Sequence, residues 1–300
     1  TCLSQTEAPN PFWSPTLSDY IGLEQDWCQG VDLGGASYLG CLARAVQAIR
    51  GGACRTAIVM AADAGTTINR SSMSAYRPEW QWPVGLMGPP GSFGLLTNRY
   101  KATYSLDDRA LAKLAVTQRA HAVLNDNACE KLRRPITVDD YLGSRVISDP
   151  IRLLDCVMPC DGGSAVVVTS TARARELGIQ RMVHPIGYGE RTNYKIRDQL
   201  VDILDGGHSV AGRRALAEAG LAPSDIRMFH PYDDFLIAVM LQMEHIGICE
   251  RGDSSRFILE NDISYQGNFP INTGGGQISA GQPGLAGGGP PQHARGGAGP

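Results

Sequence analysis

Apolar residues recur along the chain at two spacings, which alternate between those typical of helices and of strands. Residues 36–50 place apolar side chains on one helical face, and Gly51-Gly52 follows as a stop signal. Residues 56–62 form a continuous apolar run with β-branched side chains, as in a strand covered on both faces. A short strand-like run at 28–33 precedes the helix. The opening pattern therefore predicts strand, glycine turn, helix and strand.

The same alternation continues to about residue 246, which favours a layered α/β fold of two similar halves. Proline-rich residues 1–26 indicate a loop. Residues 69–98 lack periodicity and suggest either a functional insertion or a surface excursion without a role. Ser105 is expected to cap the first of the later helices. We predict helices over 106–124, 137–141, 172–177, 210–219 and 233–246, and strands over 164–169, 182–188 and 226–230.

Composition narrows the possible partners. The 300 residues are 43% hydrophobic, enough for a substantial core. The net charge of -3, without a Lys/Arg cluster, argues against a nucleic-acid partner or an anionic membrane surface. Neither a signal peptide nor a membrane span is visible, so we expect a cytoplasmic protein. The start at Thr1, without methionine, suggests a fragment or a trimmed start.

Cysteines are scattered through the chain, which does not fit a small disulfide-rich scaffold. We expect buried, reduced thiols. The C-x-x-x-C pair formed by Cys156 and Cys160 has no second ligand pair for a zinc site. The eight cysteines are Cys2, Cys28, Cys41, Cys54, Cys129, Cys156, Cys160 and Cys249.

Four short motifs follow one another between about residues 28 and 288. Residues 31–37 (V-D-L-G-G-A-S), 153–166 (L-L-D-C through D-G-G-S-A-V), 232–235 (Y-D-D-F) and 272–284 (N-T-G-G-G, then G-Q-P-G) resemble, in this order, four thiolase segments. These are the turn holding the nucleophilic cysteine, D-G-A-A-A, N-E-A-F, and N-x-x-G-G followed by G-H-P-x-G. The chain is similar to the sterol-carrier-protein-type branch of the thiolases.

This resemblance implies the α/β thiolase fold, with two similar halves in a layered αβαβα arrangement. Residues 1–155 would be an incomplete N-terminal half, 156–288 the C-terminal half, and 289–300 a low-complexity tail. Relative to a full thiolase, the first strands and the last segment, with its second catalytic cysteine, are missing. Dimerisation through the N-terminal halves is expected by analogy.

The main departure from thiolases lies at the nucleophile, which must be a thiolate at a helix N-terminus. The resemblance places Gly35 there, and glycine cannot form an acyl-enzyme. Ser37 is either a nucleophile or a helix N-cap, and Leu39 breaks the G-x-S-x-G pattern. Backbone N–H groups near Gly34 and Gly35 would still stabilise an enolate or a thioester oxyanion.

Further departures affect the proton chemistry. Gln282 replaces the family histidine; it can donate a hydrogen bond to an oxyanion but is not a base near pH 7. Tyr232 replaces the family asparagine and is either a proton-transfer group or a packed aromatic residue. His230 is either catalytic or a structural residue at a strand end. Asp233 and Asp234 fit N-terminal helix charges better than an acid–base pair.

The candidate residues form two groups. The proposed catalytic residues are Tyr232, Gln282 and His230. The proposed substrate-binding residues are Gly34, Gly35, Ser37, Asp233, Asn272, Gly275, Gly276 and Gly281.

Three functions stay open. The first is a non-covalent acyl-CoA C–C lyase, resembling the aldolases of bacterial steroid side-chain breakdown, which work with an OB-fold and zinc-ribbon partner of the DUF35 type. The second is a thiolase-type acyltransferase, possible if the alignment at Gly35 is shifted. The third is a non-catalytic acyl-CoA or lipid-binding subunit. The resemblance implies no cofactor beyond the coenzyme A of the substrate.

Overall fold

The computed structural model describes residues 1–2, 10, 12–64, 66–67, 78–86, 88–192, 202–284 and 286. The chain divides into two compact units, each drawn from separate stretches of sequence. Unit 1 comes from Thr1–Ser71, Pro159–Ile186 and Gln282–Pro290, and unit 2 from Ser72–Met158 and Gly187–Gly281. The division into sequence halves at residue 155 stays a prediction, and the predicted tail at 289–300 lies outside the described residues.

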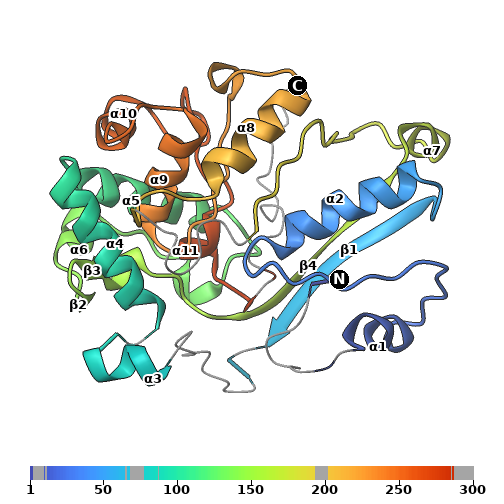
Figure 1. The fold of residues 1–300 in the computed structure, drawn as a ribbon, viewed down its shortest axis with the longest axis horizontal. Coiled ribbons are helices and arrows are strands. Elements are labelled where there is room, and N and C mark those ends of the chain that lie inside the picture. Colours follow the sequence, from blue (N-terminus) through green and yellow to red (C-terminus); the bar gives the residue numbers. More distant parts are fainter. Residues whose placement is uncertain are drawn as a thin grey trace. The chain divides into compact units, whose positions relative to one another are not determined.

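Unit 1 is built on a two-stranded antiparallel sheet. Strand β1 (Thr56–Ala64) pairs with β4 (Asp161–Thr169) over its whole length. Helix α2 (Ser37–Arg50) packs along this pair (Figure 1). Burial alternates along β1, so the prediction of a strand covered on both faces is wrong in this structure. The unit also contains α1 (Trp13–Tyr20) and α7 (Thr171–Glu176).

The D-G-G sequence lies inside β4 rather than before it. A Cβ at Gly163 would come within 2.9 Å of the Ala62 Cβ on the paired strand, so glycine allows the close approach. Asp161 accepts hydrogen bonds from the backbone N–H of Thr66 at 2.8 Å and of Thr67 at 3.3 Å. These bonds tie the segment after β1 to the first residue of β4.

Unit 2 is a helical assembly around α5 (Asp108–Val123), which contacts α6, α9, α10 and α11. Its core is rich in large aromatic and aliphatic side chains, including Tyr100, Leu114 and Met240. The remaining elements are α3 (Pro78–Gln81), η1 (Trp82–Val84), α4 (Pro89–Thr103), η2 (Glu130–Leu132), α6 (Val138–Leu142), β2 (Val146–Ser148), β3 (Ile151–Arg152), η3 (Leu153–Asp155), α8 (His208–Ala219), η5 (Pro223–Asp225), α9 (Leu236–Ile246), α10 (Ser254–Glu260) and α11 (Gly276–Ala280).

Several helix ends differ from the sequence prediction. Asp107, not Ser105, caps α5, because its side chain accepts a hydrogen bond from the Arg109 N–H at 2.9 Å. Helix α1 lies in the segment predicted as loop, and α4 starts inside the predicted insertion. By contrast, Thr137 caps α6 and forms a capping box with Asp140, which confirms the predicted helix start.

Three predicted strands do not form. Residues 181–192 have no regular structure, and Val183 is 97% exposed. In the run at 226–230 only Phe229 makes a bridge, to Ile271. The run at 28–33 likewise contributes isolated bridges only. An apolar run becomes a strand only beside a continuous hydrogen-bonding partner. The runs at 28–33 and 226–230 meet partners only at isolated bridges, and the described residues 182–188 form no bridge.

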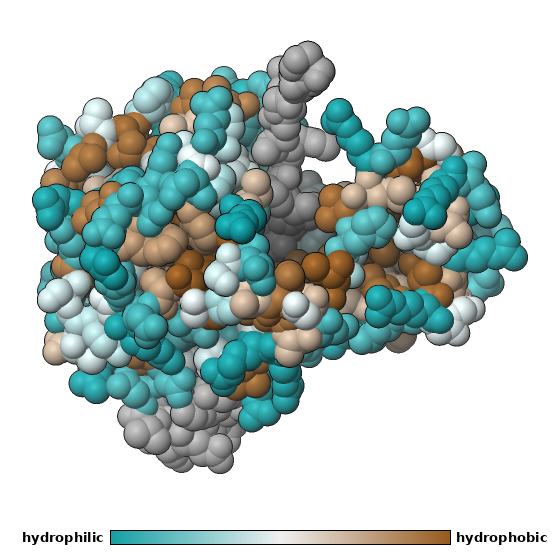
Figure 2. Space-filling model, turned by 90° about the horizontal axis from the view of Figure 1, so that it is seen from above, coloured by the Kyte–Doolittle hydropathy of each residue, from teal (hydrophilic) through white to brown (hydrophobic). Residues whose placement is uncertain are grey.

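On the face shown in Figure 2, hydrophilic residues are interspersed with hydrophobic ones. Across the described ranges, no helix combines the length and the apolar character needed to cross a bilayer.

Candidate functional site

Tyr232 lies just before α9, and this helix holds its backbone. The Tyr232 N–H donates to Gln242 Oε1 at 3.1 Å, and Gln242 Nε2 donates to the Tyr232 carbonyl at 2.6 Å. Gln242 stands on α9 and is buried. Both backbone polar groups of the tyrosine are thus fixed by a side chain from a rigid helix.

The Tyr232 side chain is hydrogen-bonded to a carboxylate. Its hydroxyl donates to Asp234 Oδ2 at 2.6 Å. Both side chains are half-buried. Burial raises the pKa of Asp234 to about 6, while the hydrogen bond from Tyr232 acts in the opposite direction. A phenol and a carboxylate with a pKa near neutrality therefore share one hydrogen bond.

The Asp233 side chain accepts hydrogen bonds from the backbone at the start of α11. Its Oδ1 accepts from the Gln277 N–H at 2.8 Å, and its Oδ2 accepts from the Ile278 N–H at 3.4 Å. Burial raises the pKa of Asp233 to about 7, although both hydrogen bonds favour the ionised form. The prediction that Asp233 and Asp234 lie at the N-terminus of the 233–246 helix is wrong, because α9 starts only at Leu236.

The glycine-rich loop before α11 depends on unusual backbone angles. Asn272 has φ 46°, a left-handed conformation that asparagine tolerates better than most residues. A Cβ at Gly275 would lie 2.7 Å from the Ala122 Cβ, and a Cβ at Gly276 would lie 2.0 Å from Asp233 Oδ2. The two glycines therefore let the loop approach α5 and Asp233. Gly281 ends α11 with φ 107°.

His121 joins this site, although the sequence analysis did not select it. Its Nε2 accepts a hydrogen bond from the Tyr265 N–H at 2.9 Å, so Nδ1 carries the proton and donates to the Asn272 carbonyl at 3.1 Å. Burial lowers its pKa. The neutral ring therefore stabilises the loop before α11 through the Asn272 carbonyl. The sequence feature that could have identified His121 is its position as a polar residue on the buried face of the 106–124 helix. His230 is exposed at the end of its run.

The turn before α2 belongs to unit 1. Gly34 has φ 57°, and Gly35 precedes the helix. The Ser37 hydroxyl accepts from the Leu33 N–H at 2.8 Å and donates to the Gly34 carbonyl at 2.6 Å. Ser37 is fully buried and is the first residue of α2 rather than its N-cap. Its hydroxyl therefore closes the turn.

The thiols nearest in sequence to this turn have other contacts. Cys41 is buried one turn into α2, and its Sγ lies 3.9 Å from that of Cys2. Cys28 is exposed, contrary to prediction, and its Sγ lies 3.9 Å from Ser18 Oγ. The Gln282 carbonyl accepts from the Cys160 N–H at 3.1 Å. Gln282 and the turn lie in unit 1 and Tyr232 in unit 2, so a joint site of these residues stays a prediction.

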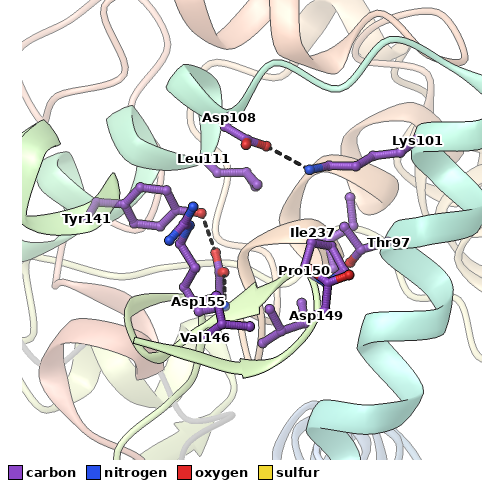
Figure 3. A pocket seen from close by; sticks show the side chains of 12 residues that line it. Thr97, Lys101, Asp108, Leu111, Tyr141, Val146, Asp149, Pro150, Asp155 and Ile237 are labelled. Carbon is purple, nitrogen blue, oxygen red and sulfur yellow. Dashed lines mark hydrogen bonds and ion pairs between the residues drawn. The ribbon is translucent and has the colours of Figure 1, made fainter. Parts of the chain in front are cut away.

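Unit 2 also contains a cavity of about 140 Å³ (Figure 3). Lys101 and Asp108 form an ion pair of 3.1 Å at its wall, and the Tyr141 hydroxyl donates to Asp155 Oδ1 at 2.7 Å. These groups are paired with one another, which indicates a structural role. The lining residues are Thr97, Lys101, Asp108, Leu111, Tyr141, Val146, Asp149, Pro150, Ile151, Arg152, Asp155 and Ile237.

Comparison with known proteins identifies the fold. Residues 189–289 match the family described as thiolase C-terminal domain-like. The "Steroid side-chain-cleaving aldolase" of Thermomonospora curvata is 36% identical over 206 residues, which cover 66% of this chain and 52% of that protein. The "17-hydroxy-3-oxo-4-pregnene-20-carboxyl-CoA lyase" of Mycobacterium tuberculosis is 34% identical over 207 residues, with the same coverages of 66% and 52%. The chain spans about half the length of these curated relatives.

Solved structures agree with this. The structure titled "Ltp2-ChsH2(DUF35) aldolase" superposes with a TM-score of 0.74 at 28% identity, covering 93% of this chain and 74% of that one. An Acat5 thiolase from Ascaris suum, at 14% identity and a TM-score of 0.66, shares the fold and covers 96% of this chain and 77% of that one. The chain therefore has the thiolase fold, its residues 189–289 match the thiolase C-terminal domain-like family, and its relatives include the steroid side-chain-cleaving aldolases and sterol carrier protein 2.

Proposed function

We propose that this chain is the thiolase-like part of an acyl-CoA C–C lyase that cleaves a β-hydroxyacyl-CoA by a retro-aldol reaction. The observation that carries the proposal is Gly35, which has no side chain at the turn where a thiolase nucleophile would stand. The turn is closed by backbone groups and by the Ser37 hydroxyl, which is hydrogen-bonded to the Leu33 N–H and the Gly34 carbonyl. Chemistry that needs no acyl-enzyme suits this arrangement.

The proposed reaction needs a proton acceptor and a site for an enolate oxygen. Tyr232 would accept the proton of the β-hydroxyl group. The bond between Cα and Cβ then breaks, the Cβ oxygen becomes a carbonyl, and the electron pair moves onto the thioester as an enolate. N–H donors would stabilise the enolate oxygen, a role that the resemblance to thiolases assigns to the Gly34-Gly35 turn and to Gln282. Protonation of Cα completes the cleavage.

The names of the relatives suggest the substrate and the partner. The Mycobacterium tuberculosis relative is named for a 17-hydroxy steroid with a 20-carboxyl-CoA group, in which the hydroxyl is β to the thioester. A similar β-hydroxyacyl-CoA, with a bulky ring system, is the proposed substrate here. The aldolase structure whose title pairs Ltp2 with a DUF35 protein suggests a DUF35-type partner for this chain as well. A homodimer and a cytoplasmic location stay predictions.

Direct assay tests the lyase function. We expect this protein, with its DUF35-type partner, to convert 17-hydroxy-3-oxo-4-pregnene-20-carboxyl-CoA into the 17-ketone and propionyl-CoA, the products that retro-aldol cleavage requires. Tyr232→Phe should lower kcat by about 10²-fold or more, because the phenol oxygen is lost. Tyr20→Phe, at an 88% exposed position in unit 1, is the matched control and should leave kcat unchanged. Mass spectrometry of both products provides the measurement.

Radiolabelled acyl-CoA distinguishes this function from acyl transfer. The lyase should retain no label after denaturation, because no covalent intermediate forms. Label that stays bound to a cysteine would refute the lyase and favour a thiolase-type acyltransferase. Release of neither product, with acyl-CoA still bound, would instead favour the non-catalytic binding subunit.

A further inference from the structure

Asp233 and Asp234 are adjacent, but the structure gives them separate tasks. Asp233 is 1% exposed and accepts two backbone N–H groups of α11, which uses both of its oxygens. Asp234 has its Oδ2 on the Tyr232 hydroxyl at 2.6 Å. The sequence suggested the same helix-end role for both residues. Only the second carboxylate is placed to exchange a proton with the tyrosine.

We propose that Asp234 is a positioning residue that receives the phenolic proton of Tyr232 when the tyrosine accepts the proton of the substrate. The inference rests on the proposed lyase function and deepens it. The direction of the hydrogen bond carries the argument. Because the single phenolic hydrogen points at Asp234, the oxygen of Tyr232 faces any third group as an acceptor. That oxygen can take a substrate proton without becoming positively charged only if its own proton moves to Asp234.

The proton movements balance without another reactant. The β-hydroxyl proton moves to Tyr232 Oη while the phenolic proton moves to Asp234 Oδ2, and cleavage of the bond between Cα and Cβ leaves the thioester enolate. The proton then returns from Asp234 through Tyr232 to Cα. The carboxylate and the phenol are thereby reset for the next turnover.

The surroundings of the pair suit this role. Gln242 on α9 is hydrogen-bonded to both the backbone N–H and the backbone carbonyl of Tyr232, so the backbone from which the tyrosine side chain extends is fixed. Partial burial raises the pKa of Asp234 to about 6, which makes the ionised form a stronger base than an exposed aspartate. Among the described titratable groups, Tyr232 faces Asp234 through the hydrogen bond, and the charges of Asp233 and Asp234 interact unfavourably.

Asp234→Asn tests the proposal in the full lyase assay. Asparagine keeps the size and one acceptor oxygen but cannot take a proton at neutral pH. We expect kcat to fall by about 10²-fold while KM changes by roughly twofold or less. Asp234→Glu should recover part of the rate, since it restores a carboxylate. Asp139→Asn, on the exposed first turn of α6, is the matched control and should behave like the natural sequence.

The pH profile separates proton acceptance from structural support. In the natural sequence, kcat/KM should rise with pH through about 6 as Asp234 ionises, and this limb should disappear in Asp234→Asn. Unchanged kcat and an unchanged limb would overturn the role of Asp234 alone. A natural sequence that releases no product would overturn the lyase function itself. If circular dichroism shows that Asp234→Asn does not fold, Asp234→Glu provides the test instead. This variant keeps a carboxylate and should keep the acidic limb of the pH profile, so loss of the limb in Asp234→Glu would refute the proposal.

Discussion

At the scale of single residues, the orientation of a carboxylate decides what it does. Asp233 is buried and accepts a hydrogen bond from the backbone at the start of α11, whereas Asp234 accepts a hydrogen bond from the hydroxyl of Tyr232. The pKa of each carboxyl is raised chiefly by burial. A buried carboxyl with a raised pKa favours its neutral form and therefore links stability to pH.

Asp233→Asn should reveal this linkage. The pKa of Asp233 is about 7 in the folded chain and near 3.8 without its environment, so the folded state holds the proton longer. Its contribution to stability is complete below about pH 4 and declines as the pH rises through 7. The free energy of unfolding of the natural sequence, minus that of the variant, should therefore fall between pH 5 and pH 8. Urea titrations at both pH values measure it, and a constant difference would contradict the prediction.

At the scale of elements, the loop before α11 is fitted between α5 and Asp233. Asn125 Nδ2 donates to the Gly274 carbonyl at 2.9 Å, and the Gly275 N–H donates to the Asn272 carbonyl at 2.8 Å. His121 holds the same carbonyl through Nδ1. Close packing of this backbone against α5 positions α11, whose first backbone N–H groups donate to Asp233.

Gly275→Ala should lower the free energy of unfolding by more than the strain of a positive φ at that position alone would. Gly275 has φ 103°, and its new Cβ would meet Ala122 at 2.7 Å. We expect a loss of about 2–4 kcal/mol in the free energy of unfolding, from strain and overpacking together. Gly220→Ala is the control, because φ is +68° there and no atom lies within 4 Å of the added Cβ. That variant should lose about 1 kcal/mol by the same urea titration. Equal losses would mean that packing against α5 contributes nothing.

At the scale of the whole molecule, the two units have unequal cores. Unit 2 buries large side chains such as Tyr100, Leu114 and Met240. Among the described residues of unit 1, those buried in the core are mainly alanine, valine and cysteine, and the large one is Tyr38. Since each buried methylene adds to stability, the smaller side chains of unit 1 give it the weaker core.

Hydrogen exchange should therefore be faster in unit 1. We expect the backbone amides of β1 and β4 to exchange about tenfold faster, or more, than those of α5 and α9, because local opening follows the density of buried apolar contacts. Exchange of the intact chain, followed by mass spectrometry of its peptides, provides the comparison. Equal protection in β1 and α5 would show that the chain opens as a single unit.

Local features of the fold follow from the sequence alone. Helices at α2, α5 and α8, and the capping box at Thr137, follow from spacing and side chains within a few residues of each other. The order of four motifs predicted the thiolase fold, which the comparisons confirm. The glycine at position 35 is likewise a fact of the sequence.

The partners of the apolar runs and of the polar side chains depend on the packing of segments that are distant in sequence. The runs at 182–188 and 226–230 have strand composition but lack a continuous neighbouring strand, and Asp233 accepts a hydrogen bond from Gln277, 44 positions away. His121 is bound to residues more than 140 positions distant. Propensity acts over a few residues, whereas ladder pairing, burial and the resulting pKa shifts depend on which distant segments pack together.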